Sequence, residues 1–214
     1  MPIFRERELG FMLGHGESKV MVVPQSFRGF DHAAMLQNLW PDLPHLEHLL
    51  VIGGEGAQSF EAALTEPAWE NDPEAAQILS ATRPSADDVT QLMYTSGTTG
   101  EPKGVMHTAN TVSANIWAYA ERLHLGADDV VLMASPMAHQ TGFMYGLLMP
   151  IMLGARTVLQ DVWDPQLAAQ VIRDEGVSFT MASTPFLADL TRVVGESVQA
   201  GGPGVPTLKT FLCA

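Results

Sequence analysis

The chain of 214 residues has a single cysteine, Cys213, which excludes a disulfide bond within it and suits a reducing cytoplasm. Cations are scarce: 11 lysines and arginines stand against 24 acidic residues, and the formal net charge of −13 argues against a nucleic-acid surface. The longest apolar stretch, residues 143–155, is shorter than the roughly 20 residues of a transmembrane helix. The N-terminus lacks the apolar core of a signal peptide. We therefore expect a cytoplasmic protein with no transmembrane segment and no nucleic-acid partner.

Ligands for a structural metal are also scarce. Among the seven histidines, only His45 and His48 have a spacing that shares one helix face, and no cysteine or third ligand accompanies them. The acidic pairs Asp87–Asp88 and Asp128–Asp129 each precede an expected strand. We interpret these pairs as turns at strand entries and predict no zinc site and no acid–base pair there.

Short apolar runs alternate with helical patterns along the chain. We expect strands over residues 19–24, 49–53, 89–94, 105–107, 130–134, 156–160, 177–181 and 209–213. We expect helices over residues 5–13, 31–40 and 141–153, and after the start signals Thr108 or Asn110, Asp164–Pro165 and Thr184–Pro185. Residues 54–86 have little periodicity and are expected to form loops with a short helix near Phe60. This alternation predicts an α/β fold with largely parallel sheets flanked by helices.

The most informative segment, residues 95–104, has the sequence Thr-Ser-Gly-Thr-Thr-Gly-Glu-Pro-Lys-Gly and follows the alternating run 89–94. Glycines let a backbone turn tightly and direct N–H groups at an anion, hydroxyls add donors, and Lys103 adds a mobile positive charge. Such a loop is suited to a polyphosphate, although a Gly/Ser/Thr-rich surface turn is the alternative. It is not a Walker A loop, because Lys103 follows Gly100 by three residues and precedes Gly104 rather than Ser or Thr.

The run from Tyr94 to Val105 resembles the signature of the adenylate-forming superfamily, which includes acyl-CoA synthetases, firefly-type luciferases and nonribosomal peptide adenylation domains. Residues 135–142 resemble the second core motif of that family, in which a proline and a histidine precede a helix that lines the acyl pocket. Further matches in order and spacing occur at residues 2–9, 153–156, 164–165 and 184–186. The similarity is to medium-chain or cyclohexanecarboxylate-type acyl-CoA ligases. It implies a central fragment of the large N-terminal domain.

The resemblance implies that the complete enzyme joins a carboxylic acid to ATP, releases pyrophosphate, and transfers the acyl group to coenzyme A, with Mg²⁺ as cofactor. It implies that the phosphates are bound by Thr95, Ser96, Gly97, Thr98, Thr99, Gly100 and Lys103. It further implies catalytic roles for Lys103 and His139, and contact with the acyl substrate for Met137, His139 and Phe143. A solvated lysine and core packing of the other residues are the alternatives. No metal ligand is predicted in this chain.

Several parts of the family pattern have no counterpart in these 214 residues: the adenine-contacting Tyr-Gly-x-Thr-Glu segment, the ribose-binding aspartate, the hinge, and the C-terminal domain with its catalytic lysine. We therefore expect a first α/β unit with connecting loops over residues 1–86, and a phosphate-loop subdomain over 87–214 that is truncated at its C-terminal end. We expect no adenylation activity from the chain alone, and self-association through surface exposed by truncation.

Two other functions remain open at this point. The chain could belong to an adenylation domain of a peptide or siderophore pathway, which differs in the acid and in the acceptor thiol. It could also be a non-catalytic remnant that binds phosphate without turnover. The apolar stretch between Met137 and Leu153 favours an apolar acid and hence the synthetase.

Overall fold

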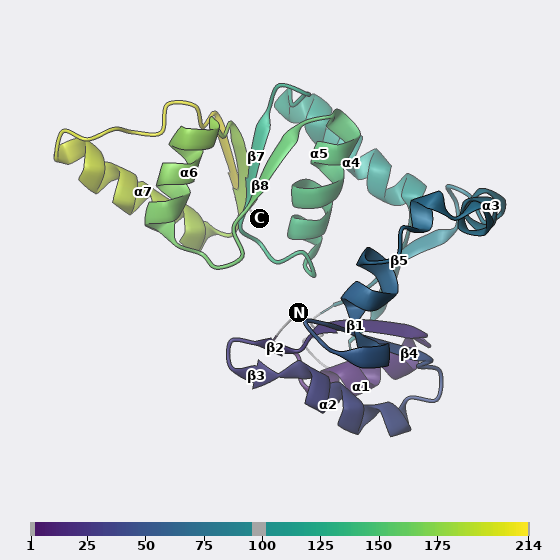
Figure 1. Cartoon of the computed structure of the whole chain (residues 1–214). Coiled ribbons are helices and arrows are strands. Elements are labelled where there is room, and N and C mark those ends of the chain that lie inside the picture. The colour runs from purple at the N-terminus through teal and green to yellow at the C-terminus, as the bar shows by residue number, and fades with distance from the viewer. Residues whose placement is uncertain (1–2, 96–101, 214) are drawn as a thin grey trace. The chain divides into compact units, whose positions relative to one another are not determined.

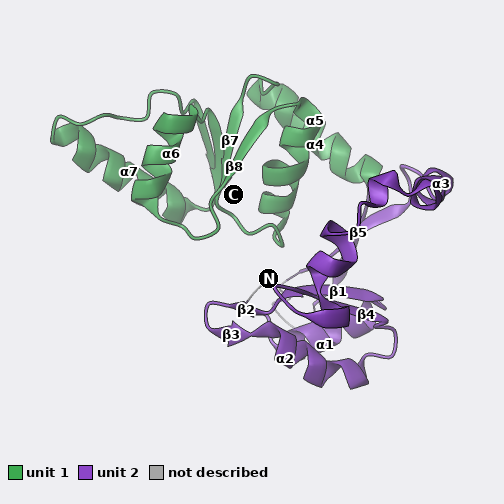
Figure 2. Cartoon of the chain, in the orientation of Figure 1, with its two compact units in different colours: residues 1, 109–214 green, residues 2–108 purple. Residues whose placement is uncertain are grey.

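The computed structural model describes residues 3–95 and 102–213 of the chain (Figure 1). Two compact units follow one another along the sequence, residues 2–108 and residues 109–214, coloured purple and green in Figure 2. The boundary expected between residues 86 and 87 stays a prediction. No helix within 3–95 and 102–213 has the length and apolar character to cross a membrane.

A two-stranded parallel sheet forms the core of the first unit. Strands β1 (Val20–Pro24) and β4 (His48–Ile52) pair in register from Val20–His48 to Pro24–Ile52. One face of this sheet packs on helices α1 (Glu6–His15) and α2 (His32–Leu39). The Asp31 carboxylate caps α2 by accepting the Ala34 N–H at 2.8 Å. The connection also contains β2 (Ser26–Phe27), β3 (Phe30–Asp31) and the short helix η1 (Trp40–Asp42). The predicted strands and helices of this part are confirmed to within two residues.

Residues 54–86 contain more helix than the sequence pattern indicates. The short helix expected near Phe60 is η3 (Glu61–Thr65), and it lies between η2 (Gly56–Gln58) and η4 (Trp69–Asn71). The prediction of loops is wrong at α3 (Pro73–Ala81), where Asp72 caps the helix by accepting the Glu74 N–H at 2.9 Å. None of the α3 residues is buried, so this helix contributes no residue to the core of the unit.

The second unit is built on a four-stranded parallel sheet with the order β10-β9-β7-β8. Its strands are β7 (Val130–Met133), β8 (Arg156–Leu159), β9 (Phe179–Ala182) and β10 (Thr210–Cys213). Every residue of the two central strands, β7 and β9, is buried. This is the pattern of a parallel sheet that is covered on both faces. The predicted α/β class with largely parallel sheets flanked by helices is confirmed.

Helices cover the two faces of this sheet (Figure 1). One face, with Val131, Met133, Phe179 and Met181, packs against α4 (Ala109–Leu123), η5 (Thr141–Leu148) and α5 (Met149–Leu153). The opposite face packs against α6 (Pro165–Glu175) and α7 (Thr184–Gln199). Because successive strand residues point to opposite faces, Val131 and Met133 of β7 belong to one core, and Val130 and Leu132 belong to the other.

Helices α6 and α7 show two local features that the sequence pattern does not indicate. Leu167 is 46% exposed although it is a large apolar residue of α6, and the buried stripe of this helix is Ala168, Ala169 and Ile172. The small alanines let the helix approach the sheet closely, and Leu167 is left at the margin of that stripe. Helix α7 has Ser183 rather than Thr184 as its N-cap, so Thr184 is its first helical residue.

Candidate active site

The two strands that flank the predicted phosphate loop in sequence form an antiparallel hairpin. Strands β5 (Val89–Tyr94) and β6 (Gly104–Thr108) pair up to Tyr94–Gly104. One step further, the Thr95 N–H donates to the Lys103 carbonyl at 3.0 Å, and the Lys103 N–H donates to Thr95 Oγ1 at 3.3 Å. The hairpin therefore holds Thr95 and Lys103 opposite each other at the base of the loop. The other predicted phosphate-binding residues, Ser96, Gly97, Thr98, Thr99 and Gly100, lie outside the described residues.

Both residues at the loop base are accessible to a ligand. Thr95 and Lys103 are exposed. Within residues 3–95 and 102–213, the Lys103 ammonium makes no ion pair. The Thr95 hydroxyl and the compact Lys103 ammonium on this short segment are donors that suit phosphate oxygens. Their binding role stays a prediction.

The predicted acyl-site residues follow strand β7 in the other unit. His139 closes a turn in which its N–H donates to the Pro136 carbonyl at 2.9 Å. The Thr141 N–H donates to His139 Nδ1 at 3.2 Å. Because Nδ1 accepts this hydrogen bond, a neutral ring carries its proton on Nε2. His139 is exposed, so its Nε2–H is a donor suited to an anionic oxygen.

Two glycines hold this turn against the sheet. A Cβ atom on Gly142 would lie 2.2 Å from the Pro136 carbonyl oxygen, and one on Gly146 would lie 2.3 Å from Met133 Cγ. Both distances are far below a normal contact, so the start of η5 approaches the turn and β7 only because these residues lack a side chain. Sequence periodicity shows a helix over 141–153 but not this close approach.

The expected helix over residues 141–153 is present, with a change of type inside it. Its first part, η5, is a π-helix, and α5 continues from Met149 with Pro150 in its first turn. Proline has no N–H to donate to the carbonyl four residues earlier. That carbonyl, of Gly146, accepts a hydrogen bond from the Thr157 hydroxyl of β8 at 3.0 Å. π-helical turns occur frequently at functional sites.

Met137 and Phe143 lie on either side of His139 in sequence. Both are partly buried and pack against the core between the sheet and α4, η5 and α5. The structure thus brings the three predicted substrate residues into one segment, where core packing accounts for part of the two apolar side chains. Thr95 and Lys103 belong to the other unit. Substrate contact by Met137, His139 and Phe143 stays a prediction.

Sequence reasoning missed one polar residue at the same edge of the sheet. Gln160 directly follows β8 and is only 8% exposed. Its side-chain Nε2 donates to the Asp164 carbonyl at 3.0 Å, while its Oε1 has no hydrogen-bond partner within the described residues. Ligands of open α/β sheets bind at the carboxyl ends of the strands. In the sequence, the feature that could have indicated this residue is a polar glutamine at the end of an apolar strand.

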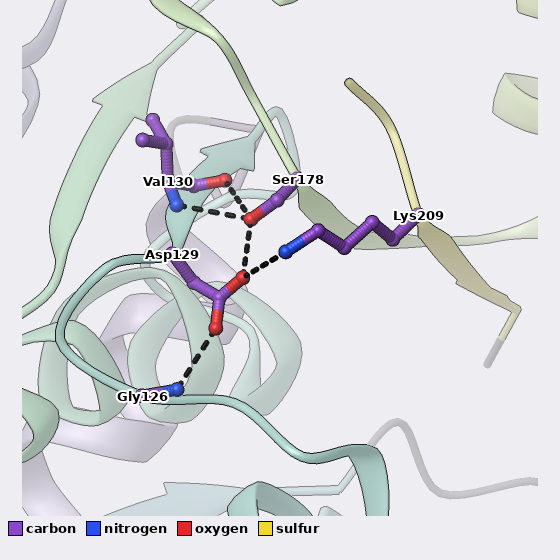
Figure 3. A network of polar contacts seen from close by, with 5 residues as sticks. All are labelled: Gly126, Asp129, Val130, Ser178 and Lys209. Atoms are coloured by element: carbon purple, nitrogen blue, oxygen red, sulfur yellow. Dashed lines mark hydrogen bonds and ion pairs between the residues drawn. The ribbon is translucent and has the colours of Figure 1, made fainter. Parts of the chain in front are cut away.

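The amino ends of the same strands carry a different polar cluster (Figure 3). Asp129 accepts hydrogen bonds from the Ser178 hydroxyl at 2.7 Å and the Gly126 N–H at 2.8 Å, and Lys209 Nζ lies 3.6 Å from its Oδ1. The Ser178 hydroxyl accepts the Val130 N–H at 3.1 Å. Burial alone would raise the pKa of Asp129, but these hydrogen bonds and the lysine charge together hold that pKa below its ordinary value. The interpretation of Asp129 as part of a strand-entry turn is confirmed.

Replacing Asp129 with asparagine is expected to destabilise the protein by about 1–3 kcal/mol, because two hydrogen bonds lose a charged acceptor. The pKa of Asp129 is lower in the folded protein than in the unfolded chain. Its carboxylate therefore stabilises the folded state at pH values above the unfolded-state pKa, and this stabilisation is lost as the pH falls through the folded-state pKa. The wild type should therefore lose more stability than the Asp129→Asn variant as pH falls from about 5 to about 3. Urea denaturation across this range measures the difference, with Asp128→Asn at the exposed neighbour as control. Parallel pH profiles for wild type and Asp129→Asn would contradict the expectation.

Comparisons with known proteins show which family and which proteins the chain is similar to. Residues 1–214 match the AMP-binding enzyme family. The chain is 29% identical over 213 residues to the medium-chain fatty-acid–CoA ligase of Escherichia coli K12, covering 100% of this chain and 36% of that protein. It is 33% identical to a salicylyl-CoA synthase / salicylate adenylyltransferase of Streptomyces sp, covering 98% and 38%. The structure of a fatty acyl CoA synthetase from Mycobacterium tuberculosis has a TM-score of 0.73 at 19% identity, over 98% of this chain and 37% of that one.

The chain therefore belongs to the AMP-binding enzyme family, whose members among these relatives are acyl-CoA ligases. The family prediction is confirmed. The chain spans 36% and 38% of the length of the two curated relatives, so it corresponds to a part of such an enzyme.

Proposed function

We propose that this chain supplies the phosphate-binding part of an ATP-dependent acid–thiol ligase of the acyl-CoA synthetase type. In this reaction a carboxylate attacks the α-phosphorus of ATP, which gives an acyl-adenylate and pyrophosphate, and the thiol of coenzyme A then takes the acyl group. The observation that carries the proposal is the Thr95–Lys103 pair at the base of the loop motif, in a chain that matches the AMP-binding family throughout. The single cysteine fits a reducing cytoplasm as the compartment.

Charge is the physical problem of the first step. Two anions must approach each other, and negative charge collects on the phosphates as pyrophosphate leaves. In the proposed site the Thr95 hydroxyl, the loop N–H groups and the Lys103 ammonium stabilise this charge. Mg²⁺ supplies further charge neutralisation when bound. The described residues contain no group of three or more His, Cys, Asp or Glu side chains that could hold a metal ion.

His139 has a different proposed role. A carboxylic acid substrate is already ionised at neutral pH, so it needs no general base. The Nε2–H of His139 instead donates to an oxygen of the substrate carboxylate or of the α-phosphate. Met137 and Phe143, which flank it, contact the acyl group.

A second candidate is favoured by one comparison. The Streptomyces relative, at 33% identity, is named both as a CoA synthase and as an adenylyltransferase for an aromatic acid. An adenylation enzyme of a peptide or siderophore pathway would use the same loop chemistry but would pass the acyl group to a carrier-bound thiol. The acid and the acceptor distinguish the two candidates, whereas the first half-reaction does not.

ATP–pyrophosphate exchange tests the proposal. The assay uses the complete polypeptide that contains this sequence and a panel of fatty, alicyclic and aromatic acids. We expect acid-dependent exchange, with preference for an apolar acid and release of AMP when coenzyme A is added. We also expect no exchange from the isolated 214-residue chain, because it lacks the family's adenine-contacting segment and catalytic lysine. Binding of pyrophosphate without exchange by the complete polypeptide would instead indicate a non-catalytic remnant.

A further inference from the structure

Three aromatic rings meet beside the base of the phosphate loop. Phe11 and His15, one turn apart on α1, stack with ring centroids 5.4 Å apart. The Tyr94 ring, at the end of β5, lies edge-on to both, at 6.0 Å from Phe11 and 5.8 Å from His15. This cluster therefore joins the C-terminal end of α1 to the last residue of the strand that enters the loop.

Hydrogen bonds fix the Tyr94 hydroxyl within this cluster. It lies 2.9 Å from His15 Nδ1 and 3.3 Å from the Met12 carbonyl oxygen. When His15 carries a proton on Nδ1, that N–H donates to the Tyr94 oxygen, and the phenol proton goes to the Met12 carbonyl. Both contacts are then hydrogen bonds at once. Burial raises the pKa of Tyr94, so the phenol keeps its proton at neutral pH.

The residue that ends α1 is a glycine, which lets the helix end lie close to Tyr94. The helix ends at Gly16, and a Cβ atom there would lie 3.3 Å from both Tyr94 Oη and Leu92 Cδ2. A Cβ atom there would also lie 3.0 Å from the Met12 carbonyl oxygen, so a larger residue would require its neighbours to shift slightly. Glycine at this position thus allows the helix end and the strand to approach closely.

The hairpin depends on such a contact because it buries little by itself. No residue of β5 or β6 is fully buried, and an isolated two-stranded hairpin is marginally stable. Tyr94 pairs with Gly104, and the next residues, Thr95 and Lys103, pair with each other. A side chain that fixes Tyr94 therefore also fixes the two residues that begin and end the loop.

We propose that His15 and Tyr94 are positioning residues for phosphate binding, through which α1 sets the geometry of Thr95 and Lys103. Neither residue needs to contact the ligand. This inference rests on the proposed function, in which Thr95 and Lys103 bind the phosphates of ATP. It assigns a role to a residue 79 positions before Tyr94 in the sequence.

The test compares four variants of the complete polypeptide. Tyr94→Phe keeps the ring and removes both hydrogen bonds, and His15→Ala removes the ring and one hydrogen bond. His15→Asn returns a polar group near the position of Nδ1. His48→Ala, at an exposed histidine on β4 of the same unit, is the matched control. Thermal unfolding of each variant identifies any general loss of structure.

His15→Ala is expected to raise the KM for ATP in pyrophosphate exchange by about three- to tenfold, the range for one lost hydrogen bond. Tyr94→Phe, which removes two hydrogen bonds, should raise this KM by at least as much. The KM for the acid should change less than about twofold, because the acyl residues lie on another segment. His15→Asn should recover part of the ATP effect, and His48→Ala should match the wild type. A purely structural role would lower the unfolding temperature and leave the KM for ATP unchanged.

Failure of this inference can be distinguished from failure of the proposed function. If the wild type exchanges pyrophosphate and both variants keep the wild-type KM for ATP, the positioning role is overturned and the function stands. If the wild type exchanges nothing with any acid, the function is overturned. Calorimetric titration of the same variants with inorganic pyrophosphate then decides the inference. Weaker binding by Tyr94→Phe than by His48→Ala would support it, and equal binding would overturn it.

Discussion

Replacing Lys103 with alanine in the complete polypeptide is expected to lower the rate of ATP–pyrophosphate exchange by about 100- to 1000-fold, the usual effect of losing one fixed donor to a developing anion. The hairpin holds the Lys103 backbone against Thr95, and its exposed ammonium makes no ion pair in the described part of the chain, so the substitution should leave folding intact. Steady-state exchange at saturating acid measures the effect.

Lys19 provides the matched control for this prediction. It lies in the same unit, is strongly exposed, and pairs with Glu47 at 3.2 Å on the surface. A surface ion pair contributes little, so Lys19→Ala should change neither exchange nor stability by much. Equal exchange rates for Lys103→Ala and Lys19→Ala would contradict the proposed catalytic role of Lys103.

The second large effect is expected at Gly142. A methyl group there would lie 2.2 Å from the Pro136 carbonyl oxygen, and neither group can rotate away because both belong to the backbone. Gly142→Ala should therefore destabilise the protein by about 1–3 kcal/mol or more, and should displace the turn that carries His139. Guanidinium denaturation measures the stability.

Gly195 gives the opposite expectation for the same substitution. It lies inside α7, and a Cβ atom there would meet nothing within 4 Å. Because alanine is the better helix former, Gly195→Ala should be neutral or stabilising by up to about 1 kcal/mol. A stability loss of the same size for both variants would show that the Gly142 effect does not come from the close contact with Pro136.

Much of the fold follows from the sequence. Strands of β-branched and apolar residues, Asp–Pro at the start of α6, and Gly176 at its end give their elements directly. The parallel sheet follows from their alternation with helices. Helix α3 was missed because it buries no residue, although Asp72–Pro73 repeats the start signal used correctly for α6. At α3, the capping residue and the following proline indicate the start of the helix, whereas the hydrophobic periodicity does not.

The candidate site was predictable in part. The loop motif and His139 have characteristic residues in a fixed order, so they could be found in the sequence. The contact between His15 and Tyr94 could not, because the two residues are 79 positions apart and only the fold brings α1 against β5. The burial of the Gln160 oxygen, which has no hydrogen-bond partner in the described part of the chain, was also not predictable, since it depends on how the segment from β8 to Asp164 folds.

The separation of the Asp129 cluster from the His139 turn has a consequence for combined substitutions. The four residues of β7 lie between them, which at about 3.3 Å per residue is roughly 13 Å. Sites this far apart with no shared partner usually have additive effects on stability. The stability effects of substitutions around His139, where we propose contact with the acid, are therefore expected to add to those of substitutions at the amino edge of the sheet. Each edge of this sheet can be altered without a coupled change in stability at the other.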